Sequence, residues 1–298
     1  MAKSVGVFLT GRIATGVIHD KNPCSSISHH PENPDETDSL LDTPLEQLVD
    51  LVCAQIARAV AECGPIDAVG LALPGIVRDG VVEDSPNLIQ LKGARMAERM
   101  RNALQNIGIA AHVAVLNDAD AVAAGIAAKV GKLDKFIRVW TLGHGIGFGR
   151  YPYTEGIWEG GHCTITLEPG EMYCGCGGRG HLEGIMGHRA MRLRFLDMEP
   201  EEVFAASKAG DQRCASFVRL WHRSLAAATA NSIHMEGAGR FYYTGFNVKF
   251  LDLKLLQHYM QQMVKMSPLQ NYSVEALPMT DDLAVNGAAI AAAQNAGQ

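Results

Sequence analysis

Two cysteines and two histidines lie close together in the middle of the chain, at a spacing that suits a metal ion. Cys174 and Cys176 are separated by a single residue, His181 follows five residues later, and His162 precedes Cys174 by twelve. Two thiolates and two imidazoles are the ligands of a closed, tetrahedral zinc site of structural type. Glycines between and after the cysteines allow the tight turns that such a site needs. We therefore predict a structural Zn²⁺ held by these four residues.

Other interpretations of these residues stay open. Cys174 and Cys176 could form a strained disulfide, although seven cysteines at irregular positions are typical of a protein from a reducing compartment. His162 and His181 could be ordinary loop histidines, and Cys163 could compete with its neighbour as a ligand. A zinc hydrolase is disfavoured, because four protein ligands leave no open position for water.

Two carboxylates accompany the proposed ligands. Glu159 precedes His162 by three residues, and Glu183 follows His181 by two. A metal bound here would therefore fix both carboxylates in space. This coupling of a metal to carboxylates is the first indication of function.

A third carboxylate, Asp118, follows Asn117 directly after an apolar strand predicted at 112–116. The carboxyl ends of strands form the edge at which open α/β sheets bind ligands. Asp118 could instead be the N-cap of the helix predicted at 119–129, because a side-chain carboxylate accepts a backbone hydrogen bond there. The pattern alone leaves both interpretations open.

A glycine-rich segment follows the strand predicted at 136–142. It reads Gly143-His144-Gly145-Ile146-Gly147-Phe148-Gly149. Alternating glycines after a strand can expose a row of N–H groups to a phosphate. Glycine hairpins are also common, so the segment by itself admits a purely structural turn.

The elements that must position these residues alternate between strands and helices, which indicates an α/β fold. We predict strands at 4–9, 13–18, 66–73, 112–116, 136–142 and 241–244, and helices from 45 to about 64 and at 93–107, 119–129, 211–236 and 281–295. Residues 21–43 are polar and contain three prolines, so we expect a surface loop there.

Composition narrows the class of protein. The chain has 298 residues, 47% hydrophobic and 19% charged, which suits two globular domains. A net charge of −6 disfavours binding to nucleic acid or to a membrane surface. We find no apolar run long enough to span a membrane and no signal peptide. We therefore expect a cytoplasmic protein.

The segment from 159 to 183 resembles the zinc-loop signature of the ROK family of sugar kinases and sugar-responsive repressors. It reads Glu159-Gly160-Gly161-His162 and then Cys174-Gly175-Cys176-Gly177-Gly178-Arg179-Gly180-His181-Leu182-Glu183, with His181 where the family has a third cysteine. The resemblance covers nearly the whole chain. It implies a two-domain actin-like ATPase (ribonuclease-H-like) fold with a cleft between the domains, and a homodimer. The N-terminal domain would comprise residues 1–117 and 280–298, and the C-terminal domain, with the zinc loop, residues 118–279.

The resemblance also implies a sugar site. The segment Leu116-Asn117-Asp118-Ala119-Asp120 is similar to the family's E-N-D-A-N, whose aspartate is the general base, so Asp118 would take this role. The residues that would hold a hexose or N-acetylhexosamine are Asn87, Asn117, Glu159, His162 and Glu183.

For the nucleotide, the resemblance implies three turns that would bind ATP with Mg²⁺. The family's D-x-G-G-T corresponds to Phe8-Leu9-Thr10-Gly11-Arg12, its G-T-G to Gly143-His144-Gly145, and its G-G-G to Gly245-Phe246-Asn247. The implied contacts are Thr10, Gly11, Arg12, Gly143, His144, Gly145 and Gly245. An aspartate, two threonines and three glycines of the family are replaced here.

The predicted function is therefore a sugar kinase with ATP as donor. The alternative is a non-catalytic, zinc-containing sugar-binding or regulatory protein that has lost nucleotide binding. ROK repressors carry an N-terminal helix-turn-helix, whereas this sequence opens with a predicted strand, so we expect no DNA binding.

Overall fold

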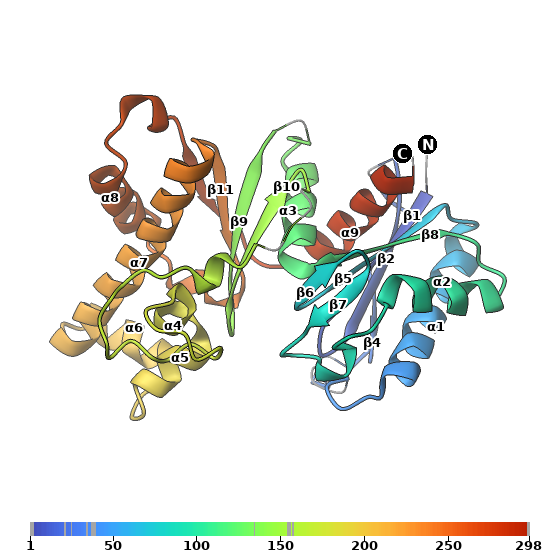
Figure 1. Ribbon diagram of the computed structural model, residues 1–298, viewed down its shortest axis with the longest axis horizontal. Helices are drawn as coiled ribbons and strands as arrows, with labels where there is room; N and C mark the ends of the chain where they lie inside the picture. Colours follow the sequence, from blue (N-terminus) through green and yellow to red (C-terminus); the bar gives the residue numbers. More distant parts are fainter. Residues whose placement is uncertain are drawn as a thin grey trace. The chain divides into compact units, whose positions relative to one another are not determined.

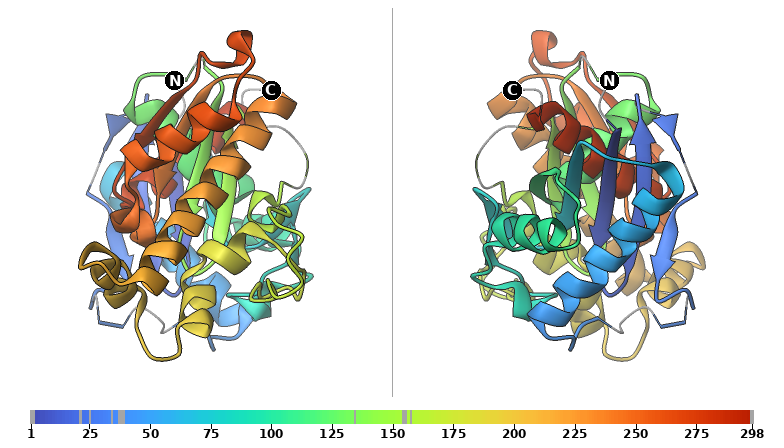
Figure 2. Two further views of the ribbon diagram at one scale, coloured as in Figure 1. Left: turned by 90° about the vertical axis from the view of Figure 1, so that its left-hand side faces the viewer. Right: turned by 90° about the vertical axis from the view of Figure 1, so that its right-hand side faces the viewer.

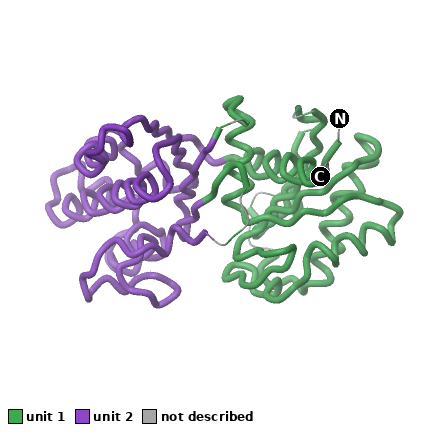
Figure 3. The backbone as a smooth tube through the Cα atoms, turned by 45° about the horizontal axis from the view of Figure 1, so that its top comes forward, with its two compact units in different colours: residues 1–135, 149–157, 280–298 green, residues 136–148, 158–279 purple. Residues whose placement is uncertain are grey.

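The computed structural model describes residues 3–20, 22–24, 26–33, 35–36, 40–133, 135–153, 156 and 158–296. The chain divides into two compact units, coloured separately in Figure 3. Unit 1 comprises residues 1–135, 149–157 and 280–298, and unit 2 comprises residues 136–148 and 158–279.

The sheet of unit 1 contains the strands predicted from the apolar runs (Figure 1). Its strands are β1 (Lys3–Leu9), β2 (Ile13–His19), β3 (Asn22–Pro23), β4 (Ser28–His30), β5 (Ala68–Leu73) and β8 (His112–Asn117). Strands β1, β5 and β8 run parallel, and β2 pairs antiparallel with β1. The short strands β3 and β4 both pair with β2, inside the segment that we predicted as a loop. Residues 21, 25, 34 and 37–39 of that segment lie outside the described residues.

The two faces of this sheet are covered by different helices, because successive side chains of a strand point to opposite faces. Val5, Val7 and Leu9 face the core that contains α1 (Leu45–Cys63) and α2 (Met96–Asn106). The opposite face meets α9 (Asp281–Ala296), on which α3 (Asp118–Lys129) packs (Figures 1 and 2).

Glycines allow α9 to approach the sheet closely. A Cβ added to Gly6 would lie 1.8 Å from the Val285 carbonyl oxygen, and one added to Gly70 would lie 1.9 Å from that of Ala288. Each of these glycines therefore removes a clash, and an alanine-rich helix can lie directly on the strands.

The position of α3 bears on the domain boundary. Gly125 in α3 touches the α9 backbone, since a Cβ there would lie 1.8 Å from the Leu283 carbonyl oxygen. By contacts α3 therefore belongs to unit 1, whereas the boundary between 117 and 118 would assign it to the C-terminal domain. The domain bounds 1–117 plus 280–298 and 118–279 stay a prediction.

The second sheet has four strands, and all of it except residues 149–151 belongs to unit 2. Its order is β10 (Ile146–Tyr151), β9 (Ile137–Leu142), β11 (Arg240–Thr244) and β12 (Ser273–Ala276). Strands β9, β11 and β12 run parallel. The core beside this sheet is formed with the helices α4 (Leu182–Met186), α5 (His188–Arg194), α6 (Pro200–Lys208), α7 (Gln212–Glu236) and α8 (Leu253–Met263).

The remaining described elements are short. Strands β6 (Ile76–Arg78) and β7 (Val81–Asp84) form a separate antiparallel pair. Four 3₁₀ helices are described: η1 (Ile89–Leu91), η2 (Gly160–His162), η3 (Phe246–Phe250) and η4 (Ser267–Leu269). Among the described residues, every helix is too short or too polar to cross a membrane.

Candidate functional site

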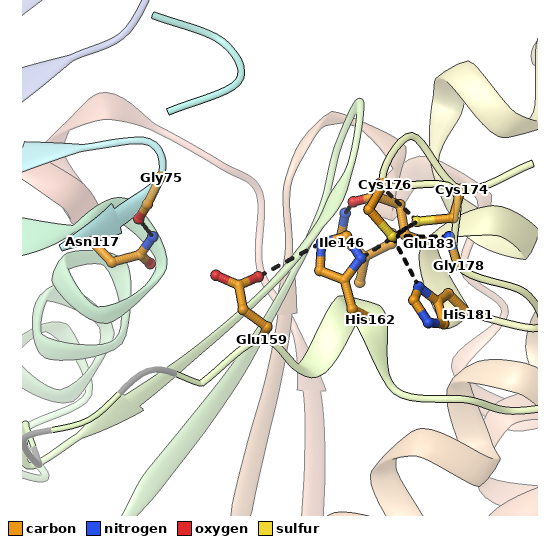
Figure 4. A network of polar contacts seen from close by, with 10 residues as sticks. All are labelled: Gly75, Asn117, Ile146, Glu159, His162, Cys174, Cys176, Gly178, His181 and Glu183. Carbon is orange, nitrogen blue, oxygen red and sulfur yellow. Dashed lines mark hydrogen bonds and ion pairs between the residues drawn. The ribbon is translucent and has the colours of Figure 1, made fainter. Parts of the chain in front are cut away.

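The four predicted metal ligands come together in unit 2, as Figure 4 shows. Cys174 Sγ lies 3.4 Å from His162 Nδ1 and 3.4 Å from Cys176 Sγ, which in turn lies 3.3 Å from His181 Nδ1. All four donor atoms lie within 4.8 Å of one another. Donor atoms in a tetrahedral zinc site with bonds of about 2.0–2.3 Å lie about 3.3–3.8 Å apart. The donor set and its shortest separations therefore fit a zinc ion.

Glycines explain why the chain can fold into this cluster. A Cβ on Gly178 would lie 2.0 Å from His181 Cε1, so any larger residue would displace the imidazole. Gly180 has a φ of +68°, and a Cβ there would lie 1.8 Å from the carbonyl oxygen of Thr166. The loop is closed by hydrogen bonds from Ile165 N to Gly180 O and from Leu182 N to Cys163 O.

The alternative interpretations of the cysteines can be compared with this geometry. Every cysteine of the sequence is a free thiol in the structure. Cys163 lies outside the group of donor atoms that meet, and burial raises its pKa to about 11. Burial likewise raises the pKa of Cys174 to about 12. Metal binding to the Cys174 thiol would therefore release its proton.

His162 connects the cluster to the first of the two carboxylates. Its Nδ1 faces Cys174, and its Nε2 lies 3.7 Å from Glu159 Oε2. Desolvation raises the pKa of Glu159, against the opposing effect of the His162 charge. One ring nitrogen thus points to the metal ligands, while the other points to a carboxylate.

The second carboxylate, Glu183, lies in α4 directly after the cluster. Its Oε2 accepts a hydrogen bond from the Ile146 N–H at 3.0 Å, and its Oε1 lies 3.5 Å from Cys174 Sγ. Glu183 therefore joins the cluster to the strand that follows the Gly143-His144-Gly145 turn.

Two turns implied for the nucleotide lie at the carboxyl ends of adjacent parallel strands, β9 and β11. Gly143 N donates to Gly145 O at 3.0 Å, which closes the first turn. Gly245 has a φ of +97°, and a Cβ there would lie 2.3 Å from Leu142 O, so this position requires glycine. The buried Asn247 links the turns, because its Nδ2 donates to Gly143 O at 3.0 Å.

An aromatic group that we did not predict lies between these turns. The Phe246 ring is 4.9 Å from that of His144 and 5.3 Å from that of His188, measured between centroids. His188 Nδ1 lies 3.2 Å from Asn247 Oδ1. A cavity of about 660 Å³ opens beside His144 and His188. His188 is 44 residues from His144 in sequence, so no local motif could have indicated it.

In unit 1, Asn117 is the N-cap of α3, and Asp118 Oδ1 also accepts from the Ala119 N–H at 2.9 Å, so Asp118 as general base stays a prediction. Asn117 Oδ1 accepts from Ala119 N at 2.9 Å. Figure 4 shows its other contact, in which Nδ2 donates to Gly75 O at 2.8 Å. Asp118 is the first helical residue and is half-buried.

Asn87 is exposed. The residues just before it contact the turn at Gly75, which also accepts the Asn117 hydrogen bond. Ser85 Oγ donates to Pro74 O at 2.9 Å. Gly75 has a φ of +117°, and a Cβ there would lie 2.2 Å from the Asp84 carbonyl oxygen. The Gly75 turn therefore contacts both the Asn117 amide and the segment that leads to Asn87.

The Thr10-Gly11-Arg12 segment is the loop of the β1–β2 hairpin. Thr10 N donates to Arg12 O at 3.0 Å, and Arg12 Nη2 donates to Pro31 O at 3.2 Å. Phe8, in the place of the family's aspartate, is only 8% exposed and pairs with Ala14 in the neighbouring strand. The end of β1 therefore presents a buried ring where the family has a carboxylate.

The predicted site residues thus form two sets. Unit 1 holds Thr10, Gly11, Arg12, Asn87, Asn117 and Asp118, and unit 2 holds Gly143, His144, Gly145, Glu159, His162, Cys174, Cys176, His181, Glu183 and Gly245.

The mixed sheets, the helices around them and the closing helix α9 define a two-domain actin-like ATPase fold of the ribonuclease-H-like type, as predicted. A solved ROK hexokinase from Thermus thermophilus superposes with a TM-score of 0.81 at 23% identity, covering 99% of both chains. The model of the ROK family matches residues 13–295. The chain therefore belongs to the ROK family.

Two curated relatives are sugar kinases. The glucokinase of Pyrobaculum calidifontis is 28% identical over 194 residues, covering 59% of this chain and 62% of that protein. The N-acetylmannosamine kinase of Haemophilus influenzae is 28% identical over 207 residues, covering 64% of this chain and 66% of that protein. The chain thus spans less than two thirds of the length of these relatives.

Proposed function

We propose that this protein is a sugar kinase that transfers a phosphoryl group from ATP to a hydroxyl of a hexose or N-acetylhexosamine. Membership of the ROK family and the two curated sugar kinases support this class of activity. The observation that carries the proposal is the orientation of His162. Its Nδ1 faces the cysteines and its Nε2 faces Glu159, so a bound metal would hold an imidazole and a carboxylate ready for sugar hydroxyls.

In this proposal Asn87, Asn117, Glu159, His162 and Glu183 contact the sugar. Amide and carboxylate groups suit this task, because sugar hydroxyls both donate and accept hydrogen bonds. The metal is Zn²⁺, bound by His162, Cys174, Cys176 and His181. When bound, it supplies a fixed centre that orders the loop from 159 to 183, which is a structural role.

Asp118 is the proposed general base. Its carboxylate takes the proton of the attacking sugar hydroxyl, the hydroxyl oxygen forms a bond to the γ-phosphorus, and the bond to the bridging oxygen breaks to release ADP. At the first residue of α3, its Oδ1 accepts a hydrogen bond from the Ala119 N–H at 2.9 Å, which orients the carboxylate.

ATP, as substrate with Mg²⁺, would meet the turns at Thr10, Gly11, Arg12, Gly143, His144, Gly145 and Gly245. Backbone N–H groups of such turns bind phosphate oxygens, and Arg12 adds a positive charge. Transfer of this kind depends on positioning and electrostatics, so these turns matter as much as the base.

The second candidate is a sugar-binding or regulatory protein without nucleotide binding. Two observations favour it: Phe8 is buried where the family has an aspartate, and the Phe246 ring packs against His144 and His188 where the family has glycine. Both residues stand where the family resemblance implies nucleotide contacts. The residues proposed to contact the sugar are those that the family resemblance implies.

Phosphoryl transfer from MgATP to a panel of hexoses and N-acetylhexosamines tests the proposal. Thermal-shift measurements on the same samples separate the candidates. A kinase is stabilised by its sugar and by MgATP, because ligands that bind the native state raise its stability. Stabilisation by a sugar alone, with no transfer to any acceptor, would contradict the kinase and support the second candidate.

The family resemblance also leads us to propose a homodimer. Sedimentation equilibrium of the zinc-loaded protein tests this, and a single species at the monomer mass of 32.1 kDa would contradict it.

A further inference from the structure

We infer that Glu183 is a positioning residue that couples the metal centre to the Gly143-His144-Gly145 turn. Metal occupancy would fix the turn, and the conformation of the turn would set how tightly the metal is held. The inference rests on the proposed metal centre but not on sugar phosphorylation. It concerns contacts within unit 2 only.

The coupling begins with the two oxygens of one carboxylate. Oε2 of Glu183 accepts from the Ile146 N–H at 3.0 Å, and Oε1 lies 3.5 Å from Cys174 Sγ (Figure 4). A carboxylate is rigid and planar, so a shift of one oxygen moves the other. A rearrangement of Cys174 that moves this carboxylate would therefore also disturb its hydrogen bond to the Ile146 N–H.

The helix α4 carries the same coupling through its backbone. A Cβ on Gly184 would lie 2.9 Å from Cys174 N, so α4 is packed directly against this metal ligand. At the other end of α4, Gly187 faces the turn, because a Cβ there would lie 2.8 Å from His144 O. Next, His188 N donates to Gly143 O at 3.1 Å. Residues 183–188 therefore hold both ends of the turn.

The space around the turn is filled by Glu183 itself. A Cβ on Gly145 would lie 2.4 Å from Glu183 Oε2. The atom that it meets is the far end of a flexible side chain, so the carboxylate can move aside without a rearrangement of the backbone. A Cβ on Gly143 would meet nothing nearer than 3.6 Å, which is ordinary van der Waals contact.

These two glycines give a matched pair of variants within one turn. Gly145→Ala would push Glu183 away from Ile146 and from Cys174, whereas Gly143→Ala would leave Glu183 in place. Groups that orient metal ligands from the second layer typically change metal affinity by about 10- to 100-fold when they are lost. Coupling between two sites is reciprocal, so a change in the turn must appear at the metal.

The first test is zinc release to a chromogenic chelator from the full-length, zinc-loaded protein. We expect Gly145→Ala to change zinc retention by about tenfold or more, and Gly143→Ala to match the parent within about twofold. Equal retention by the two variants would overturn the inference.

The second test remains informative if Gly145→Ala fails to fold. Hydrogen exchange is followed in peptides that cover 143–148, with and without chelation, in the parent and in Glu183→Ala. We expect chelation to accelerate exchange in the parent, and Glu183→Ala to exchange fast whether or not zinc is present. An equal effect of chelation in both proteins would show that the coupling does not pass through Glu183. Neither readout requires phosphoryl transfer, so failure of the kinase proposal would be seen separately.

Discussion

The ring of Phe246 meets the imidazole of His144 edge-on, with ring centroids 4.9 Å apart. Aromatic rings in this geometry attract each other, and His188 completes the group at 5.3 Å from Phe246. Two of the three turns that the family resemblance assigns to the nucleotide, at 143–145 and 245–247, are thus bridged by side chains. This contact bears directly on whether ATP can bind.

Phe246→Gly should restore room between the turns. We expect the dissociation constant for MgATP to fall by about tenfold, a change of about 1.4 kcal/mol, because the nucleotide no longer has to displace the ring. Isothermal titration calorimetry measures this, with Phe250→Ala as control, since Phe250 belongs to the same 3₁₀ helix but stacks on Phe204. An unchanged or weaker affinity in Phe246→Gly would show that the ring does not limit nucleotide binding.

Gly178→Ala should remove the metal by displacing His181, because the new Cβ would lie 2.0 Å from the imidazole. Gly175→Ala is the matched control, since its Cβ would meet only Arg189 Nη1 at 3.5 Å and Glu183 Oε1 at 4.0 Å. We expect a zinc content well below one ion per chain for the first variant and close to one for the second. Elemental analysis after dialysis decides this, and equal zinc in both variants would argue against His181 as a ligand.

Removal of zinc should expose two thiols of unequal reactivity. Cys176 is exposed, whereas burial raises the pKa of Cys174 to about 12. The thiolate is the reactive form, so alkylation of Cys174 in the chelated protein should accelerate about tenfold per pH unit up to about pH 11. Mass spectrometry of alkylated peptides measures both rates. Rapid labelling of Cys174 at neutral pH would contradict the raised pKa of its thiol. Labelling that zinc does not prevent would contradict Cys174 as a metal ligand.

Gly70→Ala should destabilise unit 1, because its Cβ would lie 1.9 Å from the Ala288 carbonyl oxygen in α9. Overpacking of this kind typically costs about 1–3 kcal/mol and sometimes more. Gly16→Ala, whose Cβ would meet only side chains at 3.1 and 3.3 Å, should cost less. Urea unfolding compares the two variants. A smaller loss for Gly70→Ala than for Gly16→Ala would mean that α9 does not lie on the sheet as described.

The strands and the metal ligands could be predicted from the sequence because local patterns indicate them. The apolar runs gave strands within one or two residues of β1, β2, β8 and β9. The proposed ligands His162, Cys174, Cys176 and His181 lie within twenty residues of one another, so their spacing alone indicates a common site. The match to the ROK family confirms the resemblance that these residues suggested.

The contacts of Asn247 and His188 could not be predicted from the sequence, because they depend on long-range packing. Asn247 bonds Gly143 across 104 residues, and His188 reaches both the Gly143 turn and Asn247. At a shorter range, Asn117 caps α3 while Asp118 Oδ1 accepts from the same Ala119 N–H, and the sequence does not show how two neighbouring polar residues share one donor. None of these contacts leaves a periodic or compositional signal.

The central claim is that Asp118 serves as the base of a sugar kinase, and phosphoryl transfer by Asp118→Asn tests it most directly. Asp120→Asn is the control, because Asp120 lies in the same helical turn and an amide oxygen can still accept from Arg150 N, as its Oδ1 does at 2.9 Å. Loss of a general base typically slows transfer by about 10²–10⁴-fold. We expect transfer from MgATP in the parent, near-parent transfer in Asp120→Asn and a loss of that size in Asp118→Asn. Transfer that survives in Asp118→Asn, or its absence from the parent with every sugar tried, would contradict the account.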